Sequence, residues 1–294
     1  MSDLHAVGAI PVDPAPKGTR VCCIIGWPVE HSLSPAMHNA AFRDAGLDWV
    51  YVPLPVPPDA VADAIAGIRA LGISGANVTM PHKRSVIEHL DEVSDDAQRI
   101  GAVNVIVRAG DRLLGANTDG QGFLRFLERE AGVQAAGANI LLLGAGGAAR
   151  AVGVALGDAG ASVTIAARDG TSAAEACEAV GPDAKAVPFE DAPSEAAAAD
   201  VIVNATPLGT AGLGTPIPAE AIESRHLVVD LVYAPPVTPL IAAARARGAR
   251  AHNGIGMLID QAALAFELWT GTPAPLEALS AAALRGIRDD SDIR

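Results

Sequence analysis

The run Ile140-Leu141-Leu142-Leu143-Gly144-Ala145-Gly146-Gly147-Ala148-Ala149 decides the fold of this 294-residue chain. Four aliphatic residues predict a buried strand, and the turn after them leads into an alanine-rich helix, which fits the pattern G-x-G-x-x-A. Gly144 permits the tight turn, Gly146 lets a pyrophosphate approach the backbone, and Ala149 allows close helix packing. The helix start offers unpaired N–H groups to phosphate. The run therefore predicts a dinucleotide-binding unit, in preference to a glycine-rich turn that binds nothing.

The choice of dinucleotide depends on the end of the next predicted strand, 162–166, which is followed by Ala167-Arg168-Asp169. An arginine at this place accommodates the 2′-phosphate of NADP, whereas an acid binds the ribose hydroxyls of NAD. Arg168 favours NADP. Asp169 either binds the ribose or caps a helix that begins near Thr171. The sequence thus favours NADP and leaves NAD open.

Downstream of the glycine-rich turn, strand and helix patterns alternate, which is typical of a doubly wound parallel sheet. The predicted elements are the strand Ser162–Ala166, the helix Thr171–Val180, the strands Asp200–Asn204 and Leu227–Leu231, and the helix Thr238–Arg247. Two amphipathic helices, 255–269 and 275–288, follow without a further strand. They need a surface to cover, and we expect them to pack on the first half of the chain.

Upstream, the same alternation predicts a separate α/β unit that ends in a hairpin. The predicted elements are the strand Val21–Gly26, a helix from Ser34 to about Ala45, the strand Trp49–Val56, a helix from about Asp59 to Leu71, the strand Ala76–Met80, a helix opened by Pro81, a hairpin with its turn at Gly110-Asp111, and a helix from Asp119 to about Ala131. The opening residues are rich in proline, and we expect a flexible tail.

These patterns predict an α/β fold with an N-terminal α/β substrate domain, a C-terminal Rossmann-type dinucleotide-binding domain and a cleft between them. The expected bounds are a tail at 1–19, a substrate-binding catalytic domain at 20–120 with the helices of 255–294 packed back on it, and a dinucleotide-binding domain at 121–254.

Composition narrows the class of partner. The net charge of −13 opposes binding to nucleic acid and provides no polybasic membrane patch. No apolar run reaches membrane-spanning length, and the N-terminus lacks the pattern of a signal peptide. Cys22, Cys23 and Cys177 form neither a disulfide framework nor a zinc-ligand spacing, so we expect a reducing compartment and no metal. The sequence predicts a cytoplasmic protein that binds a small molecule.

Polar residues in the first half lie where βα loops converge at the carboxyl ends of strands. Ser32 and Ser34 offer two hydroxyls to a carboxylate, although Ser34 alone is better explained as a helix N-cap. Asn77 and Thr79 end a predicted strand. Lys83 then lies in the first turn of the predicted helix, where a cation opposes the helix dipole and asks for a functional explanation, the alternative being a solvated surface lysine.

Two more polar sites frame the predicted hairpin. Asn104 begins it, and Asn117-Thr118-Asp119 closes it at the head of the next helix. The alternative to a role in a binding site is that Thr118 or Asp119 only caps that helix.

Seven segments of the chain form an ordered set from about residue 24 to 270. They are HSLSPAMHN, ANVTMPHK, GAVNV, GANTDGQGF, LLLGAGGAARAV, NATPLG and NGIGMLIDQAALAFELW. In this order they resemble the signature segments of the shikimate dehydrogenases. An ordered set of this length is more specific than the glycine pattern alone.

The resemblance implies a role for residues that match the family's motifs. The implied catalytic pair is Lys83 and Asp119. The implied substrate-binding residues are Ser32, Ser34, Thr79, Asn104, Tyr233 and Gln261. The implied cofactor-binding residues are Gly144, Ala145, Gly146, Gly147, Ala148, Arg168, Asp169, Thr206 and Gly254. One departure is that NADP-using members often read Asn-Arg-Thr where this chain has Ala167-Arg168-Asp169.

The resemblance implies a reversible NADP-dependent reduction of 3-dehydroshikimate to shikimate, in aromatic amino acid biosynthesis, by a monomer or homodimer. The runner-up is an NAD-dependent quinate/shikimate dehydrogenase. A non-catalytic dinucleotide-binding regulator would have no reason to keep Lys83, Asn104 and Asp119 together. A 2-hydroxy acid dehydrogenase needs a catalytic histidine with a carboxylate and an arginine, and the histidines of this chain do not come with that set.

Overall fold

The structure is a computed structural model that describes residues 18–211 and 214–292. Residues 1–17 of the tail expected at 1–19 therefore lie outside the described residues. Contacts within the chain divide it into two compact units. The first unit comprises the described residues up to Thr118 together with Gln261–Arg288, and the second contains Asp119–Asp260. The expected α/β fold is confirmed in both units.

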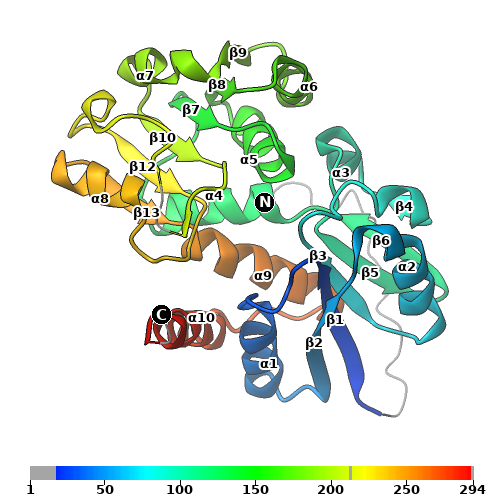
Figure 1. Ribbon diagram of the computed structural model, residues 1–294. Coiled ribbons are helices and arrows are strands. Elements are labelled where there is room, and N and C mark those ends of the chain that lie inside the picture. The colour runs from blue at the N-terminus through cyan, green and yellow to red at the C-terminus, as the bar shows by residue number, and fades with distance from the viewer. Residues whose placement is uncertain (1–17, 212–213, 293–294) are drawn as a thin grey trace. The chain divides into compact units, whose positions relative to one another are not determined.

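The first unit is built around one mixed six-stranded sheet in the order β2-β1-β3-β5-β6-β4 (Figure 1). Strand β1 pairs in parallel with β2 and β3, whereas β3, β5 and β6 pair antiparallel. The elements are β1 (Arg20–Gly26), α1 (Ser34–Asp44), β2 (Trp49–Pro55), a 3-10 turn (Pro58–Ala60), α2 (Val61–Ala70), β3 (Gly75–Val78), a 3-10 turn (Ile87–His89), β4 (Glu92–Val93), α3 (Asp95–Ile100), β5 (Val105–Ala109) and β6 (Arg112–Ala116).

Alternate residues of β1 point to opposite faces of this sheet, and each face has its own helices. Cys23 and Ile25 pack with Ile65 of α2 and Ala97 of α3 in one apolar cluster. The other face is covered by α1 and by the later part of α9 (Ile255–Thr270), where Phe42 and Phe266 lie 5.5 Å apart between ring centroids. The first sheet is therefore buried on both sides.

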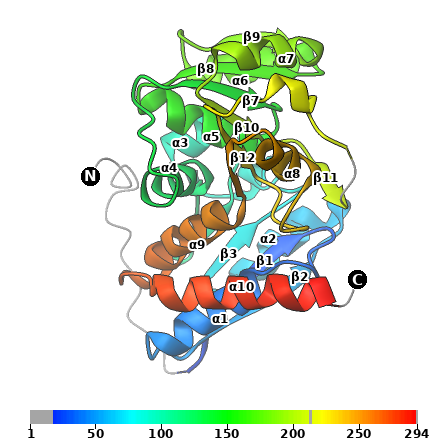
Figure 2. The ribbon, with the colours of Figure 1, turned by 90° about the vertical axis from the view of Figure 1, so that its left-hand side faces the viewer.

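Helix α10 (Leu276–Asp292) belongs to the first unit as far as Arg288. In Figures 1 and 2 it lies beside α1. A Cβ atom on Gly286 would meet the Leu33 side chain at 2.6 Å, so α10 approaches the entrance of α1 closely at this glycine.

The second unit contains a sheet in the order β13-β12-β10-β7-β8-β9, with every pair parallel. Its elements are α4 (Asp119–Arg129), β7 (Asn139–Leu143), α5 (Gly147–Asp158), β8 (Ser162–Ala167), α6 (Gly170–Val180), β9 (Lys185–Pro188), α7 (Ala192–Glu195), β10 (Val201–Asn204), β11 (Leu208–Ala211), β12 (Leu227–Asp230), α8 (Pro239–Ala246) and β13 (Arg250–Asn253), with 3-10 turns at Phe189–Asp191, Ala196–Ala198 and Ala219–Ala221.

The order of these strands reverses between β7 and β10, which is the switch point where doubly wound folds bind ligands. Leu141 and Leu143 face an apolar cluster that includes residues of α7 and α8. Leu142 points the other way, toward Gly153 of α5. The second sheet is thus covered on both faces, as a parallel sheet requires.

The helix expected from Pro81 is wrong. Residues 80–86 form turns, followed by the short 3-10 turn at 87–89. The reason is that this segment pairs outward: Val103 N donates to the Lys83 carbonyl at 2.7 Å, and His82 Nε2 lies 2.6 Å from the carbonyl of Val56. Lys83 therefore does not lie in the first turn of a helix and does not oppose a helix dipole.

The strand and helix patterns missed several short elements, including β4, α3, β9, β11 and β13. Within the described residues, no helix is long and apolar enough to cross a membrane.

Candidate functional site

The glycine-rich turn follows β7 at the switch point of the second sheet. Gly144 has φ +109°, and a Cβ there would lie 3.2 Å from the Ala205 carbonyl oxygen, so only glycine fits comfortably. A Cβ on Gly146 would meet nothing within 4 Å, which leaves open space beside the backbone. Helix α5 then starts without a side-chain cap and with no acidic residue in its first turn. These features fit a bound pyrophosphate.

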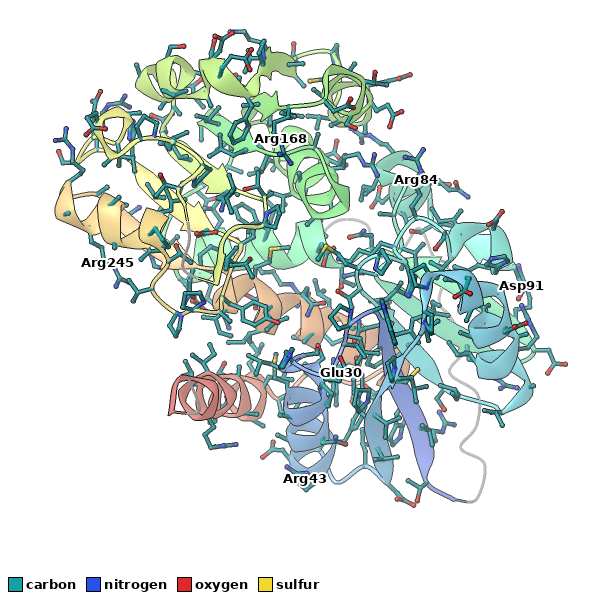
Figure 3. All side chains as sticks on the ribbon, in the orientation of Figure 1. Glu30, Arg43, Arg84, Asp91, Arg168 and Arg245 are labelled. Carbon is teal, nitrogen blue, oxygen red and sulfur yellow. The ribbon has the colours of Figure 1, made fainter. Side chains whose placement is uncertain are left out.

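The segment after β8 separates the two cofactor signals. Asp169 is the N-cap of α6, and its Oδ1 accepts from Ser172 N at 2.7 Å. Hydrogen bonds to Ser172 hold the pKa of Asp169 below its usual value, so the carboxylate is charged at neutral pH. Arg168, labelled in Figure 3, is exposed directly after β8. The capping alternative for Asp169 is confirmed, although one carboxylate can cap a helix and still face a ligand.

A buried carboxylate connects the loops that follow β10 and β12. Asp230 is fully buried, and its Oδ1 accepts from Asn204 Nδ2 at 2.8 Å and from Val232 N at 3.1 Å. Its Oδ2 accepts from Thr238 Oγ1 at 2.6 Å. Burial raises the pKa of Asp230, and these hydrogen bonds oppose that shift. Asn204 Oδ1 in turn accepts from the backbone and hydroxyl of Thr206, at 3.0 and 2.7 Å.

The loops held in this way carry two of the expected site residues, Thr206 and Tyr233, both of which are partly exposed. Gly254 is buried against the backbone of Leu231, where a Cβ would clash. Close backbone approach is therefore sufficient to explain the glycine at 254.

In the first unit, Ser34 is not the N-cap of α1, so the capping alternative is wrong. Helix α1 begins at Ser34 itself, and no side chain caps it. The Ser34 side chain is buried, and Ser34 N donates to Ser32 Oγ at 3.2 Å. Both serines lie in the loop that leads from β1 into α1.

Thr79 and Lys83 are both partly exposed and follow β3. Thr79 N donates to the Ile25 carbonyl at 2.9 Å, and a Cβ on Gly26 would clash with the Thr79 methyl group, so this residue is held against the end of β1. The Lys83 backbone is fixed by Val103. Its neighbour Arg84, labelled in Figure 3, is exposed.

Asn104 lies at the centre of a buried polar cluster. Its Oδ1 accepts from Thr118 N at 2.8 Å, and its Nδ2 donates to Thr118 Oγ1 at 3.1 Å. Thr118 Oγ1 lies 3.2 Å from the carbonyl oxygen of Gln261. The structure thus brings together Asn104 and Gln261, which are far apart in sequence. Asn117 Nδ2 donates to the Ala102 carbonyl at 2.9 Å and fixes the same turn.

Asp119 follows this cluster as the first residue of α4 and is buried. It opens the second unit, whereas Lys83 belongs to the first. The pairing of Lys83 with Asp119 stays a prediction.

Sequence reasoning missed four buried polar residues that support the expected site: His38, Tyr51, Asn204 and Asp230. Asn204 and Asp230 each end an apolar strand, at the edge where ligands bind in parallel sheets. That position was a usable signal. His38 and Tyr51 lie inside a helix and a strand, and their pattern does not differ from that of core residues.

Three family profiles match successive parts of the chain. "Shikimate dehydrogenase substrate binding domain" matches residues 24–106, "Shikimate / quinate 5-dehydrogenase" matches 127–247, and "Shikimate 5'-dehydrogenase C-terminal domain" matches 254–284.

Curated and solved proteins resemble the chain over nearly its whole length. A shikimate dehydrogenase (NADP(+)) of Geobacter metallireducens is 48% identical over 87% of this chain and 93% of its own length. The crystal structure of shikimate 5-dehydrogenase from Thermus thermophilus, in complex with NADP(H) and shikimate, is similar with a TM-score of 0.84 and 40% identity, over 91% of this chain and all of that one. Quinate dehydrogenase from Corynebacterium glutamicum, in complex with NAD, has a TM-score of 0.84 and 32% identity, over 91% of this chain and 99% of that one.

Proposed function

Because the chain belongs to the shikimate dehydrogenase family, we propose that it catalyses the reversible NADP-dependent reduction of 3-dehydroshikimate to shikimate. It is an oxidoreductase that acts on a CH–OH group, in the biosynthesis of aromatic amino acids. The observation that carries the proposal is the near-full-length similarity to relatives named for this activity. The open glycine-rich turn and the buried cluster around Asn104 support it.

The cofactor is bound by the second unit. The residues that would hold the pyrophosphate are those of the turn at 144–148, where backbone N–H groups and the start of α5 would attract its charge. Arg168 binds the 2′-phosphate, with Asp169 beside it. Thr206 and Gly254 are the remaining residues that would contact the cofactor.

The substrate is bound mainly by the first unit. Ser32 and Ser34 bind its carboxylate, and the hydroxyl groups are bound by the remaining residues of the site. These are Thr79, Asn104, Tyr233 and Gln261. The net charge of −13 repels the anionic substrate, so local hydrogen-bond donors of this kind must supply the attraction for its carboxylate.

The reaction needs one proton transfer at the oxygen of the reacting carbon. NADP in its reduced form supplies the hydride. Lys83 donates a proton to the carbonyl oxygen during reduction and accepts it back during oxidation. Asp119 is the proposed partner of Lys83 in the reaction and binds the neighbouring hydroxyl. Val103 N donates to the Lys83 carbonyl at 2.7 Å, and this hydrogen bond fixes the backbone that carries the lysine side chain.

Replacement of Lys83 by Ala tests the assignment. Loss of a positioned acid–base group costs about 10²- to 10⁴-fold in rate, so we expect turnover to fall by at least a hundredfold. The dissociation constant for NADP should stay within twofold of wild type, measured by titration calorimetry. Near-normal turnover in the variant would remove Lys83 from the mechanism.

A second candidate is quinate dehydrogenase activity with NAD, which is favoured by the structural similarity to the Corynebacterium quinate dehydrogenase. Steady-state rates with shikimate and quinate, each with NADP and with NAD, decide between the two. We expect the highest kcat/KM for shikimate with NADP. We further propose a cytoplasmic location. We also propose a monomeric or homodimeric state, which light scattering of the purified protein tests.

A further inference from the structure

A row of buried polar side chains crosses the first unit from β2 to α9. Tyr51 Oη donates to Asn77 Oδ1 at 2.6 Å, and Asn77 Nδ2 donates to the Asn104 carbonyl at 3.2 Å. Asn104 Nδ2 donates to Thr118 Oγ1, and Thr118 Oγ1 lies 3.2 Å from the Gln261 carbonyl. Each residue in the row is at most 8% exposed. The row begins at a residue that no motif assigned to the site and ends at Gln261.

Tyr51 is held firmly at the start of this row. Strand β2 is an edge of the sheet, and Asn39 of α1 pairs with the backbone of Tyr51 through two hydrogen bonds of 2.8 Å. The Tyr51 ring stacks on His38 at 4.6 Å between centroids. Burial raises the pKa of Tyr51 well above its usual value near 10, so the hydroxyl keeps its proton and donates.

From Tyr51 to Thr118, each side chain of the row donates to the next residue. The Thr118 hydroxyl has two acceptors within reach, and the Gln261 carbonyl at 3.2 Å is nearer than Asn104 Oδ1 at 3.4 Å. Thr118 N donates to Asn104 Oδ1, and this bond distinguishes the oxygen of the Asn104 amide from its nitrogen. Buried chains of this kind polarise one another and orient their members.

Tyr51 donates into the row that leads to the proposed hydroxyl-binding residues. We propose that Tyr51 is a positioning residue of the substrate site, which acts through Asn77, Asn104 and Thr118. The inference rests on the proposed function, because it assigns Tyr51 to the binding of that substrate.

A purely structural role makes a different prediction. A hydroxyl that only stabilises the core lowers the melting temperature when it is removed, but it leaves the affinity of the folded protein for substrate unchanged. A positioning hydroxyl changes KM for shikimate, because its loss frees the Asn77 amide to reorient. The dinucleotide turn lies in the second unit, so the affinity for NADP is the internal reference.

The test compares Tyr51→Phe with wild type in the full chain, by steady-state kinetics with shikimate and NADP and by calorimetric titration of NADP. We expect KM for shikimate to rise about five- to tenfold, in line with the loss of one buried hydrogen bond. We expect kcat to fall less than threefold and the dissociation constant of NADP to stay within twofold.

A second pair of variants tests the other end of the row. Thr118→Val removes the hydroxyl at nearly constant shape and should raise KM for shikimate to a similar extent. Thr118→Ser keeps the hydroxyl, so its KM should equal that of wild type. The control is Thr270→Val, which removes the hydrogen bond from Thr270 Oγ1 to the Phe266 carbonyl in the same unit. This control should leave KM unchanged.

The possible results test the proposed function and the positioning role of Tyr51 separately. Wild-type protein without activity on shikimate would overturn the proposed function and this inference with it. Active wild-type protein, together with unchanged KM in both Tyr51→Phe and Thr118→Val, would overturn the positioning role alone, even if both variants melt at lower temperature.

Discussion

Asp169 places a negative charge beside the residue that is proposed to bind the 2′-phosphate. It caps α6 through Ser172 N, and its lowered pKa keeps it ionised at neutral pH. A carboxylate next to Arg168 opposes the phosphate and favours a ribose hydroxyl. The proposed preference for NADP is therefore weaker than Arg168 alone would give.

Replacement of Asp169 by Asn removes this charge and keeps a good N-cap. We expect the ratio of kcat/KM for NADP to that for NAD to rise severalfold, mainly through tighter binding of NADP. Asp183→Asn is the matched control, because it removes an exposed charge beyond the carboxyl end of α6. An equal ratio in wild type and Asp169→Asn would show that Asp169 does not face the cofactor.

At the scale of helices and strands, the spacing of apolar residues in the sequence predicted the elements that bury a continuous apolar run. The apolar runs of β1, β7, β10 and β12 are buried except for the partly exposed Val21 of β1, and each strand was expected within two residues of its bounds. Short edge elements such as β4 and β9 expose alternate or charged residues and bury too little to form a pattern.

The helix predicted after Pro81 is absent for another reason. Its local composition permits a helix, but the Lys83 carbonyl and the His82 ring pair with Val103 and Val56, which lie elsewhere in the chain. Tertiary hydrogen bonds of this kind leave no trace in a local pattern. The same limit applies to the site: motifs placed Asn104, but not the buried Tyr51 that is hydrogen-bonded to it through Asn77.

Close packing of α4 on α5 depends on Gly120. A Cβ there would clash with the Ala151 carbonyl and lie 2.8 Å from the Ala155 Cβ. Gly120→Ala should therefore lower the free energy of unfolding by about 1–3 kcal/mol, as other overpacked sites do. Urea denaturation measures the change.

Gly67 is the opposite case and serves as the control. It lies inside α2, and a Cβ there would meet nothing within 4 Å. Gly67→Ala should raise the free energy of unfolding by about 0.4–1 kcal/mol, because alanine loses less backbone entropy in a helix. A stabilised Gly120→Ala variant would contradict the packing argument.

Over the whole molecule, both units contain histidines that resist protonation in the folded state. Burial lowers the pKa of His38 in the first unit to about 3, and it also lowers the pKa of His226 and His252 in the second. The unfolded chain binds these protons near pH 6.5. The folded protein therefore binds fewer protons than the unfolded chain below this pH, and its stability falls as the pH falls.

His38 should contribute most to this acid sensitivity, since neither ring nitrogen has a hydrogen-bond partner among the described residues. Its contribution is present above pH 6.5 and is lost progressively as the pH falls toward 3. By linkage, one such group removes about 2 kcal/mol of stability between pH 7 and pH 5. His38→Gln should therefore lose about 2 kcal/mol less than wild type over this interval, measured by urea denaturation at the two pH values. Because the comparison concerns the slope with pH, a lower absolute stability of the variant does not affect it. Equal losses in the two proteins would mean that the folded state admits a proton at His38.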